Sequence, residues 1–199
     1  MDWITLVKST LILFAIVNPI GSIPIFLQLT NKMTPEARRR AFQTAVFTSL
    51  VILFVFILAG KWILTYFFQI QLPDLMAAGG LLLLIIAIDQ LIFGALAKSV
   101  LTSEKQDALH IGAVPIACPI LAGPGAMMTS FVTYSEDGFL IAAGSIIVVL
   151  GITWLLLHFI DKIYHFLGEI VCLVLSKILS LFIAAIGIRL LMQGLVHYF

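Results

Sequence analysis

Six apolar segments, each long enough to cross a lipid bilayer, account for most of this 199-residue chain. A hydrocarbon core about 30 Å thick requires about 20 apolar residues in a helix. Because 62% of the residues are hydrophobic and only 11% are charged, the chain cannot cover a water-exposed surface with charge. We therefore predict an all-α membrane protein with one transmembrane domain, residues 1–199, and no soluble domain. The expected crossings are residues 3–29, 41–67, 75–96, 111–134, 139–160 and 170–196.

Charge and cysteine usage exclude several functional classes. The 11 Lys and Arg residues are balanced by 10 Asp and Glu residues, so the chain offers no basic field for a nucleic acid. Cys118 and Cys172 lie in apolar segments without metal-ligand or C-x-x-C spacing, which favours two small core side chains. The sequence has no phosphate-binding loop of the G-x-x-x-x-G-K-[ST] type. We expect no metal, no other cofactor and no ATP-driven step.

The distribution of Lys and Arg predicts the orientation of the chain. The N-terminal end contributes only Lys8, and the second connection contributes only Lys61. The first, third and fifth connections are richer, and such loops face the cytoplasm. We therefore expect a bacterial inner-membrane protein with both termini periplasmic. In the first connection, residues 34–36 read Thr-Pro-Glu, a typical helix start. The richer connections carry Lys32, Arg38, Arg39, Arg40, Lys98, Lys105 and Lys162.

Clusters of Pro and Gly interrupt the first and fourth segments at matching places, in residues 18–24 and 115–126. An offset of 105 residues relates Pro19 to Pro124, which indicates a weak internal repeat of three crossings. Because three is odd, the second copy enters the membrane in the opposite orientation, as in many secondary transporters. We predict two inverted repeats, about residues 1–97 and 108–199, with helices 1 and 4 broken near mid-membrane. Re-entrant hairpins in place of broken crossings stay open as an alternative.

The two interruptions predict one shared polar site. Pro removes a backbone donor, and the freed polar groups survive in lipid only where protein or a wet cavity satisfies them. The helix that resumes after each break would present its N-terminal amides to a carboxylate. The carbonyls at the end of the helix before each break would accept hydrogen bonds from an ammonium group. No charged residue lies in either break, which favours a zwitterion. The alternative is that these prolines only kink helices for packing. The candidate substrate-binding residues are Asn18, Pro19, Gly21, Ser22, Gly123, Pro124, Gly125, Thr129 and Ser130.

Asp89 is the one acidic residue well inside an apolar segment, where a carboxylate is costly unless it is paired or wet. It is a candidate coupling or gating group for H⁺ or Na⁺, or else a structural hydrogen-bonded acid. The repeat aligns Asp89 with Arg189, but inversion places corresponding residues on opposite sides of the midplane. Lys177 lies at a depth similar to that of Asp89, so we expect it to be the better partner. Alternatively, Arg189 and Lys177 extend to their nearer interfaces.

Several motifs together resemble the MarC family of integral membrane proteins. They are the run Asn-Pro-Ile-Gly-Ser-Ile-Pro-Ile-Phe at 18–26, Arg-Arg-Arg-Ala at 38–41, Ile-Ala-Ile-Asp at 86–89, and Pro-Ile-Leu-Ala-Gly-Pro-Gly-Ala at 119–126. The resemblance covers the whole chain. It implies a six-helix protein of the bacterial inner membrane that transports small neutral amino acids, with kinship to amino-acid exporters.

Three functional classes can be compared on these features. A secondary transporter, exporting or exchanging small neutral amino acids, accounts for the repeat and the paired breaks. A passive channel or facilitator for small polar solutes would use the same breaks without coupled motion. An intramembrane enzyme would need a nucleophile and base or paired acids, and the apolar segments hold one deep acid, so we expect no enzyme. The expected partners are the lipid bilayer and a small zwitterionic solute, and assembly as a homo-oligomer is compatible with the sequence.

Overall fold

The computed structural model describes residues 3–30, 33–62, 66–67, 69–93 and 121–196. Within these ranges the longer regular elements are all helices, and no strand occurs. They are α1 (Trp3–Val17), α2 (Ile23–Leu29), α3 (Pro35–Trp62), α4 (Leu72–Ile88), the π-helix η2 (Asp89–Phe93), α7 (Pro124–Asp137), α8 (Phe139–His158) and α9 (Ile160–Val196).

Four helical stretches of the described chain are long and apolar enough to span a bilayer. At most 44% of the residues in their apolar windows are buried, and in the last stretch only 22% are. The remaining apolar side chains face outward, which is the surface expected against lipid acyl chains. The prediction of an all-helical membrane protein is thereby confirmed. The four stretches are Pro35–Gly60, Leu72–Ile92, Phe139–His158 and Ile170–Val196.

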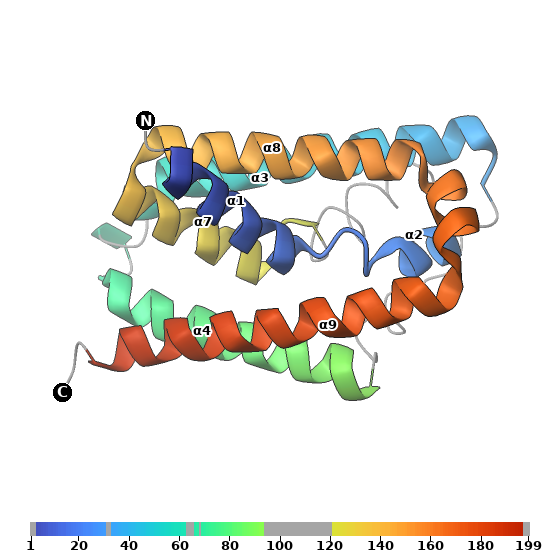
Figure 1. Ribbon diagram of the computed structural model, residues 1–199. Coiled ribbons are helices and arrows are strands. Elements are labelled where there is room, and N and C mark those ends of the chain that lie inside the picture. Colours follow the sequence, from blue (N-terminus) through green and yellow to red (C-terminus); the bar gives the residue numbers. More distant parts are fainter. Residues whose placement is uncertain (1–2, 31–32, 63–65, 68, 94–120, 197–199) are drawn as a thin grey trace.

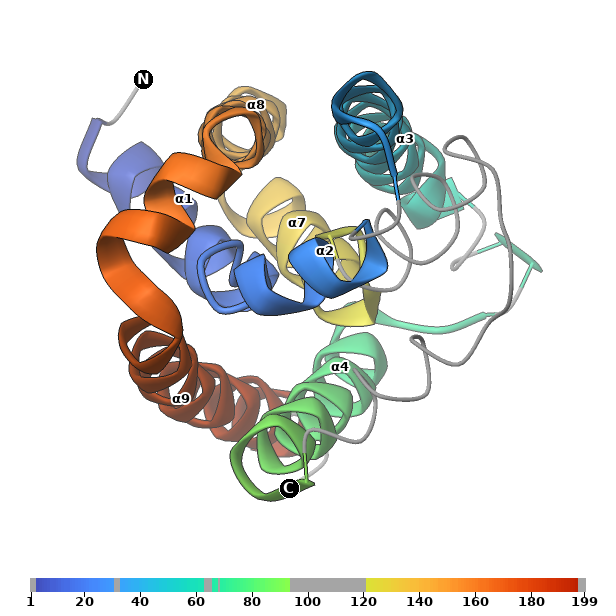
Figure 2. The ribbon, with the colours of Figure 1, turned by 90° about the vertical axis from the view of Figure 1, so that its right-hand side faces the viewer.

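The helices lie in three layers (Figure 1). α3 and α8 form one outer layer, α4 and α9 form the other, and α1, α2 and α7 lie between them, as the end-on view also shows (Figure 2). One apolar core joins the middle layer to α3 and α8, around Phe26, Leu53 and Ile146. A second core joins α7 to α4 and α9, around Leu83, Val132 and Ile183. The middle layer thus packs against both outer layers.

Different connections lie at the two ends of the molecule. At one end Arg38 Nη1 lies 2.8 Å from Asp161 Oδ1, so the first turn of α3 and the first turn of α9 lie together. At the opposite end the Ser9 hydroxyl donates to Asp137 Oδ2 over 3.3 Å, which joins α1 to the end of α7. The first and fifth connections therefore share one end of the molecule.

Local sequence explains where several helices begin. Ala37 N donates to Thr34 Oγ1 over 3.2 Å, and α3 starts at Pro35, which confirms the predicted cap. At the start of α4, Gln71 N donates to Asp74 Oδ2 over 2.8 Å. The first apolar segment is interrupted between Val17 and Ile23, at the predicted Pro and Gly cluster.

The expected fifth connection, residues 161–169, links α8 to the apolar stretch Ile170–Val196, as predicted, but most of it is itself helical. α9 begins at Ile160 and is interrupted at Gly168, where φ is 74° and ψ is 165°. Ile160, Ile163 and Tyr164 recur at helical spacing and pack against the first core, which explains why this polar stretch stays helical. Cys172 is buried, as expected for a core side chain. Cys118, the third connection and the fourth segment up to residue 120 lie outside the described residues.

Candidate functional site

The break between α1 and α2 is a compact buried turn. Asn18 has a φ of 45°, in the left-handed region that Asn tolerates better than most residues. Its Oδ1 accepts from Gly21 N over 3.1 Å, and its carbonyl accepts from the Ser22 hydroxyl over 3.0 Å. Asn18, Pro19 and Ser22 are all buried. The side chains of Asn18 and Ser22 therefore stabilise the break itself.

Gly21 allows this turn to approach α9. A β-carbon at residue 21 would lie 2.6 Å from Ser176 Oγ and 2.5 Å from Asn18 Oδ1, which is too close for any side chain. The Ser176 hydroxyl thus lies against the backbone of the break. Ser176 was not among the predicted site residues, because a contact between distant parts of the chain has no local sequence signal.

The start of α7 lies beside the end of α1. Gly123 is the extended residue before the helix and Pro124 is its first residue, a position where the missing amide hydrogen costs nothing. A β-carbon at Gly125 would lie 3.2 Å from Ile16 Cγ2 of α1 and would also collide with Leu83 of α4. Gly123 and Gly125 are buried, whereas Pro124 is exposed. The structure therefore brings the α7 start, but not the Pro124 ring, into the interior near α1.

Thr129 and Ser130, in the second turn of α7, are the polar side chains that distinguish this region. They are 5% and 2% exposed, and both hydroxyl oxygens are buried without a hydrogen-bond partner. Three other buried hydroxyls in the described chain, those of Thr30, Ser49 and Thr153, donate to the carbonyl four residues earlier. An unsatisfied buried hydroxyl is unusual, which makes Thr129 and Ser130 candidates for a hydrogen bond to a water or a solute.

Asp89 opens a π-helix at the end of α4. π-helical turns cost stability and recur at functional positions. Asp89 is partly buried, and the next residue, Gln90, accepts from the Ser180 hydroxyl of α9 over 2.8 Å. Lys177 Nζ donates to the Leu91 carbonyl over 2.7 Å. Lys177 therefore bonds to the backbone of the π-helix that contains Asp89, and its predicted pairing with the Asp89 carboxylate stays a prediction.

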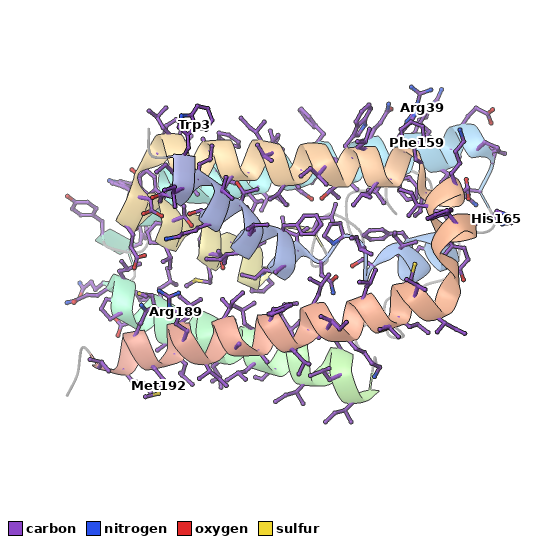
Figure 3. The ribbon with its side chains drawn as sticks, viewed as in Figure 1. Trp3, Arg39, Phe159, His165, Arg189 and Met192 are labelled. Carbon is purple, nitrogen blue, oxygen red and sulfur yellow. The ribbon has the colours of Figure 1, made fainter. Side chains whose placement is uncertain are left out.

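Arg189 lies far along α9 from that cluster. Three helical turns separate it from Lys177, and it lies toward the end of the molecule opposite Arg39 and His165 (Figure 3). The side chain is exposed. The structure thus gathers Lys177, Gln90 and Ser180 around the π-helix and leaves Arg189 apart. The Ser180–Gln90 bond was not predicted, because only the fold brings α4 and α9 into register.

These features define the class: a helical membrane protein with an interrupted buried helix and unsatisfied polar groups in its interior. The chain belongs to the MarC family, because the sequence profile of the MarC family integral membrane proteins matches residues 3–199.

Relatives over nearly the whole length support this assignment. The UPF0056 membrane protein MJ1677 of Methanocaldococcus jannaschii is 32% identical over 191 residues, covering 92% of both chains. A UPF0056 membrane protein of Buchnera aphidicola is 32% identical over 202 residues, covering 100% of this chain and 95% of that relative. The UPF0056 membrane protein YhcE of Escherichia coli is 30% identical over 191 residues, covering 92% and 88%. No solved structure matches this chain.

Proposed function

We propose that this protein is a secondary transporter, an exporter or exchanger of small neutral amino acids in the bacterial inner membrane. The observation that carries the proposal is the pair of buried, unpartnered hydroxyls of Thr129 and Ser130. They lie one turn from a helix start that packs beside a buried chain break. Unsatisfied polar groups in the interior of a membrane protein are costly unless they serve a polar ligand.

The arrangement of helices supports six crossings in two inverted repeats. α1 runs from one end of the molecule to its middle and α2 continues toward the other end, so together they have the reach of one interrupted crossing (Figure 1). α7 runs from the middle back to the first end, as the second part of a fourth crossing would. In each outer layer one helix from each proposed repeat pairs with its counterpart, α3 with α8 and α4 with α9.

The proposed site offers complementary partners to a zwitterion. The amides of Gly125 and Ala126, in the first turn of α7, have no acceptor within the helix and are suited to a carboxylate. Ala15 of α1 lacks its usual donor, because residue 19 is a proline, so its carbonyl is suited to an ammonium group. The hydroxyls of Thr129 and Ser130 would complete the shell. No charged residue lies in either part, which favours solutes without net charge.

A flux assay with variants that lack one buried hydroxyl tests the site. Thr129→Val and Ser130→Ala should reduce the uptake of radiolabelled alanine, glycine or serine into proteoliposomes by about tenfold, the loss expected for one or two ligand hydrogen bonds. The control is Thr153→Val, because Thr153 is equally buried but donates to Val149 O over 2.8 Å. Its flux should match wild type. Equal flux in all four proteins would overturn the proposed site.

The stability of these variants separates a binding role from a structural one. Removing an unpartnered hydroxyl should leave the melting temperature unchanged or raise it, whereas Thr153→Val should lower the free energy of unfolding by about 1 kcal/mol. Lost transport together with retained stability is the expected pattern for Thr129→Val. A matched loss of both would assign Thr129 to folding instead.

Asp89 is the proposed coupling residue, with Lys177 beside it and Arg189 as a more remote gating candidate. In proteoliposomes with imposed proton or sodium gradients, the wild type should accumulate amino acid against its own gradient. Asp89→Asn should abolish that accumulation while exchange continues. Gradient-driven accumulation that survives the change would exclude the coupling role. If the wild type only equilibrates the solute, the protein is a passive channel or facilitator.

A further inference from the structure

A cavity of about 260 Å³ lies between the first turns of α3 and the last turns of α8, away from the proposed transport site. Its walls combine two guanidinium groups with polar, aromatic and apolar side chains. The polar side chains of the lining and its tryptophan are Arg38, Arg39, Gln43, Trp154, His158 and Asp161.

The cavity lies at the level where a bilayer changes from acyl chains to headgroups. Its lining comes from the ends of two candidate spans, Pro35–Gly60 and Phe139–His158. Aromatic and cationic side chains mark such a boundary. Here Trp154 stacks on His158 at a centroid distance of 5.4 Å, and Lys162 lies over the Phe159 ring. A headgroup at this depth would lie directly beside the cavity.

Arg38 and Arg39 differ in how many of their hydrogen-bond donors have a partner. Arg38 is held by Asp161 and by the Thr30 carbonyl, yet its Nε is buried and has no hydrogen-bond partner. Arg39 is exposed and extends from the outer surface of α3 (Figure 3), and no described residue accepts a hydrogen bond from it. The cavity therefore offers a fixed guanidinium and an unoccupied one, a pair suited to a phosphate group.

The surroundings favour a lipid over a soluble anion. Phe42, Leu157 and Ile160 form apolar walls, and the adjoining face of α8 exposes Ile152 and Leu155. Acyl chains could lie along that face while the headgroup occupies the cavity. Asp161, 72% exposed beside Arg38, could also accept from an amino group of the headgroup.

We propose that this cavity binds the phosphate group of a phospholipid from the adjoining leaflet, through Arg39 and Arg38. Arg39 is the residue to change, because it has no structural partner in the described chain, whereas Arg38 has two. Arg40 provides the matched control, since it is an exposed neighbour of equal charge that does not line the cavity.

Native mass spectrometry of the detergent-solubilised full chain tests this proposal. We would titrate phosphatidylglycerol and, separately, diacylglycerol with the same acyl chains. The wild type and Arg40→Gln should retain phosphatidylglycerol equally, and Arg39→Gln should bind it about fivefold more weakly. Equal retention by all three proteins would overturn the assignment, as would equal binding of diacylglycerol. Displacement of the lipid by millimolar inorganic phosphate would assign the cavity to a soluble anion instead and would also overturn it.

Discussion

At the residue scale, the conformation of Asn18 determines the shape of the chain break. A φ of 45° places most β-carbons too close to the following carbonyl, but Asn compensates by bonding locally. Here the compensation is the 3.1 Å bond from Gly21 N to Asn18 Oδ1. The turn is thus held by one side chain, and Gly21 leaves space for Ser176 to contact it.

Two substitutions at residue 18 separate backbone strain from hydrogen bonding. Asn18→Gly keeps the left-handed conformation and loses the side-chain bond, which should cost about 1 kcal/mol. Asn18→Ala loses the same bond and adds roughly 1–2 kcal/mol of left-handed strain. Thermal unfolding in detergent should therefore rank wild type above Gly and Gly above Ala, with transport impaired in both. An Ala variant as stable as the Gly variant would show that Asn18 does not impose the strain.

At the element scale, the close approach of α4 and α9 is built on glycine. A β-carbon at Gly80 would lie 2.5 Å from the Gly187 carbonyl oxygen, and one at Gly194 would lie 2.5 Å from the Pro73 carbonyl oxygen. Such contacts are between backbones, so no side-chain rotation relieves them. Small residues allow helices to pack at this distance in lipid, where the hydrophobic effect does not drive association.

Matched glycine variants test this packing. Gly80→Ala should force α4 and α9 apart and destabilise the protein by about 1–3 kcal/mol, the usual cost of overpacking. Gly151→Ala is the control, because a β-carbon there meets nothing within 4 Å and alanine favours the helix by up to about 1 kcal/mol. Melting temperatures should fall for the first and rise or stay constant for the second. A Gly80→Ala variant with wild-type stability would contradict the observed spacing.

How well the elements could be predicted depended on whether their causes are local. The start of α3 at Pro35 and the break after Val17 follow from capping and proline chemistry within a few residues, and both were predicted. The connection over residues 161–169 was predicted, but its helical conformation was not, because the apolar stripe of Ile160, Ile163 and Tyr164 is short and lies within a polar stretch. The π-helix at Asp89 likewise depends on contacts with α9, which the local sequence does not encode.

At the scale of the whole molecule, the two ends hold different parts of the chain. Arg38, in the basic first connection, pairs with Asp161 at one end, and the two termini lie near the other end (Figure 1). Paired Pro and Gly clusters in the sequence indicated the candidate site near residues 18–22 and 123–130, and the structure brings Gly125 of α7 against Ile16 at the end of α1. Which hydroxyls are unsatisfied was not predictable, because this depends on neighbours contributed by other helices.

Reporter fusions test the orientation of the whole chain. Both termini are expected on the periplasmic side, because basic connections are retained in the cytoplasm. Alkaline phosphatase fused after residue 199 should be active, and a fluorescent protein that matures only in the cytoplasm should be dark at the same position. The opposite result for the two fusions would reverse the proposed orientation while leaving the fold unchanged.

In the proposed site, Thr129 is reached by water and by amino acids. Introducing Thr129→Cys into a chain that also carries Cys118→Ala and Cys172→Ala tests this accessibility. In proteoliposomes, a water-soluble thiol reagent should modify this cysteine, and alanine should slow the reaction as it occupies the site. Thr153→Cys, in the packed core, should stay unmodified. If residue 129 is as inert as residue 153 from both sides of the membrane, no transport site exists there.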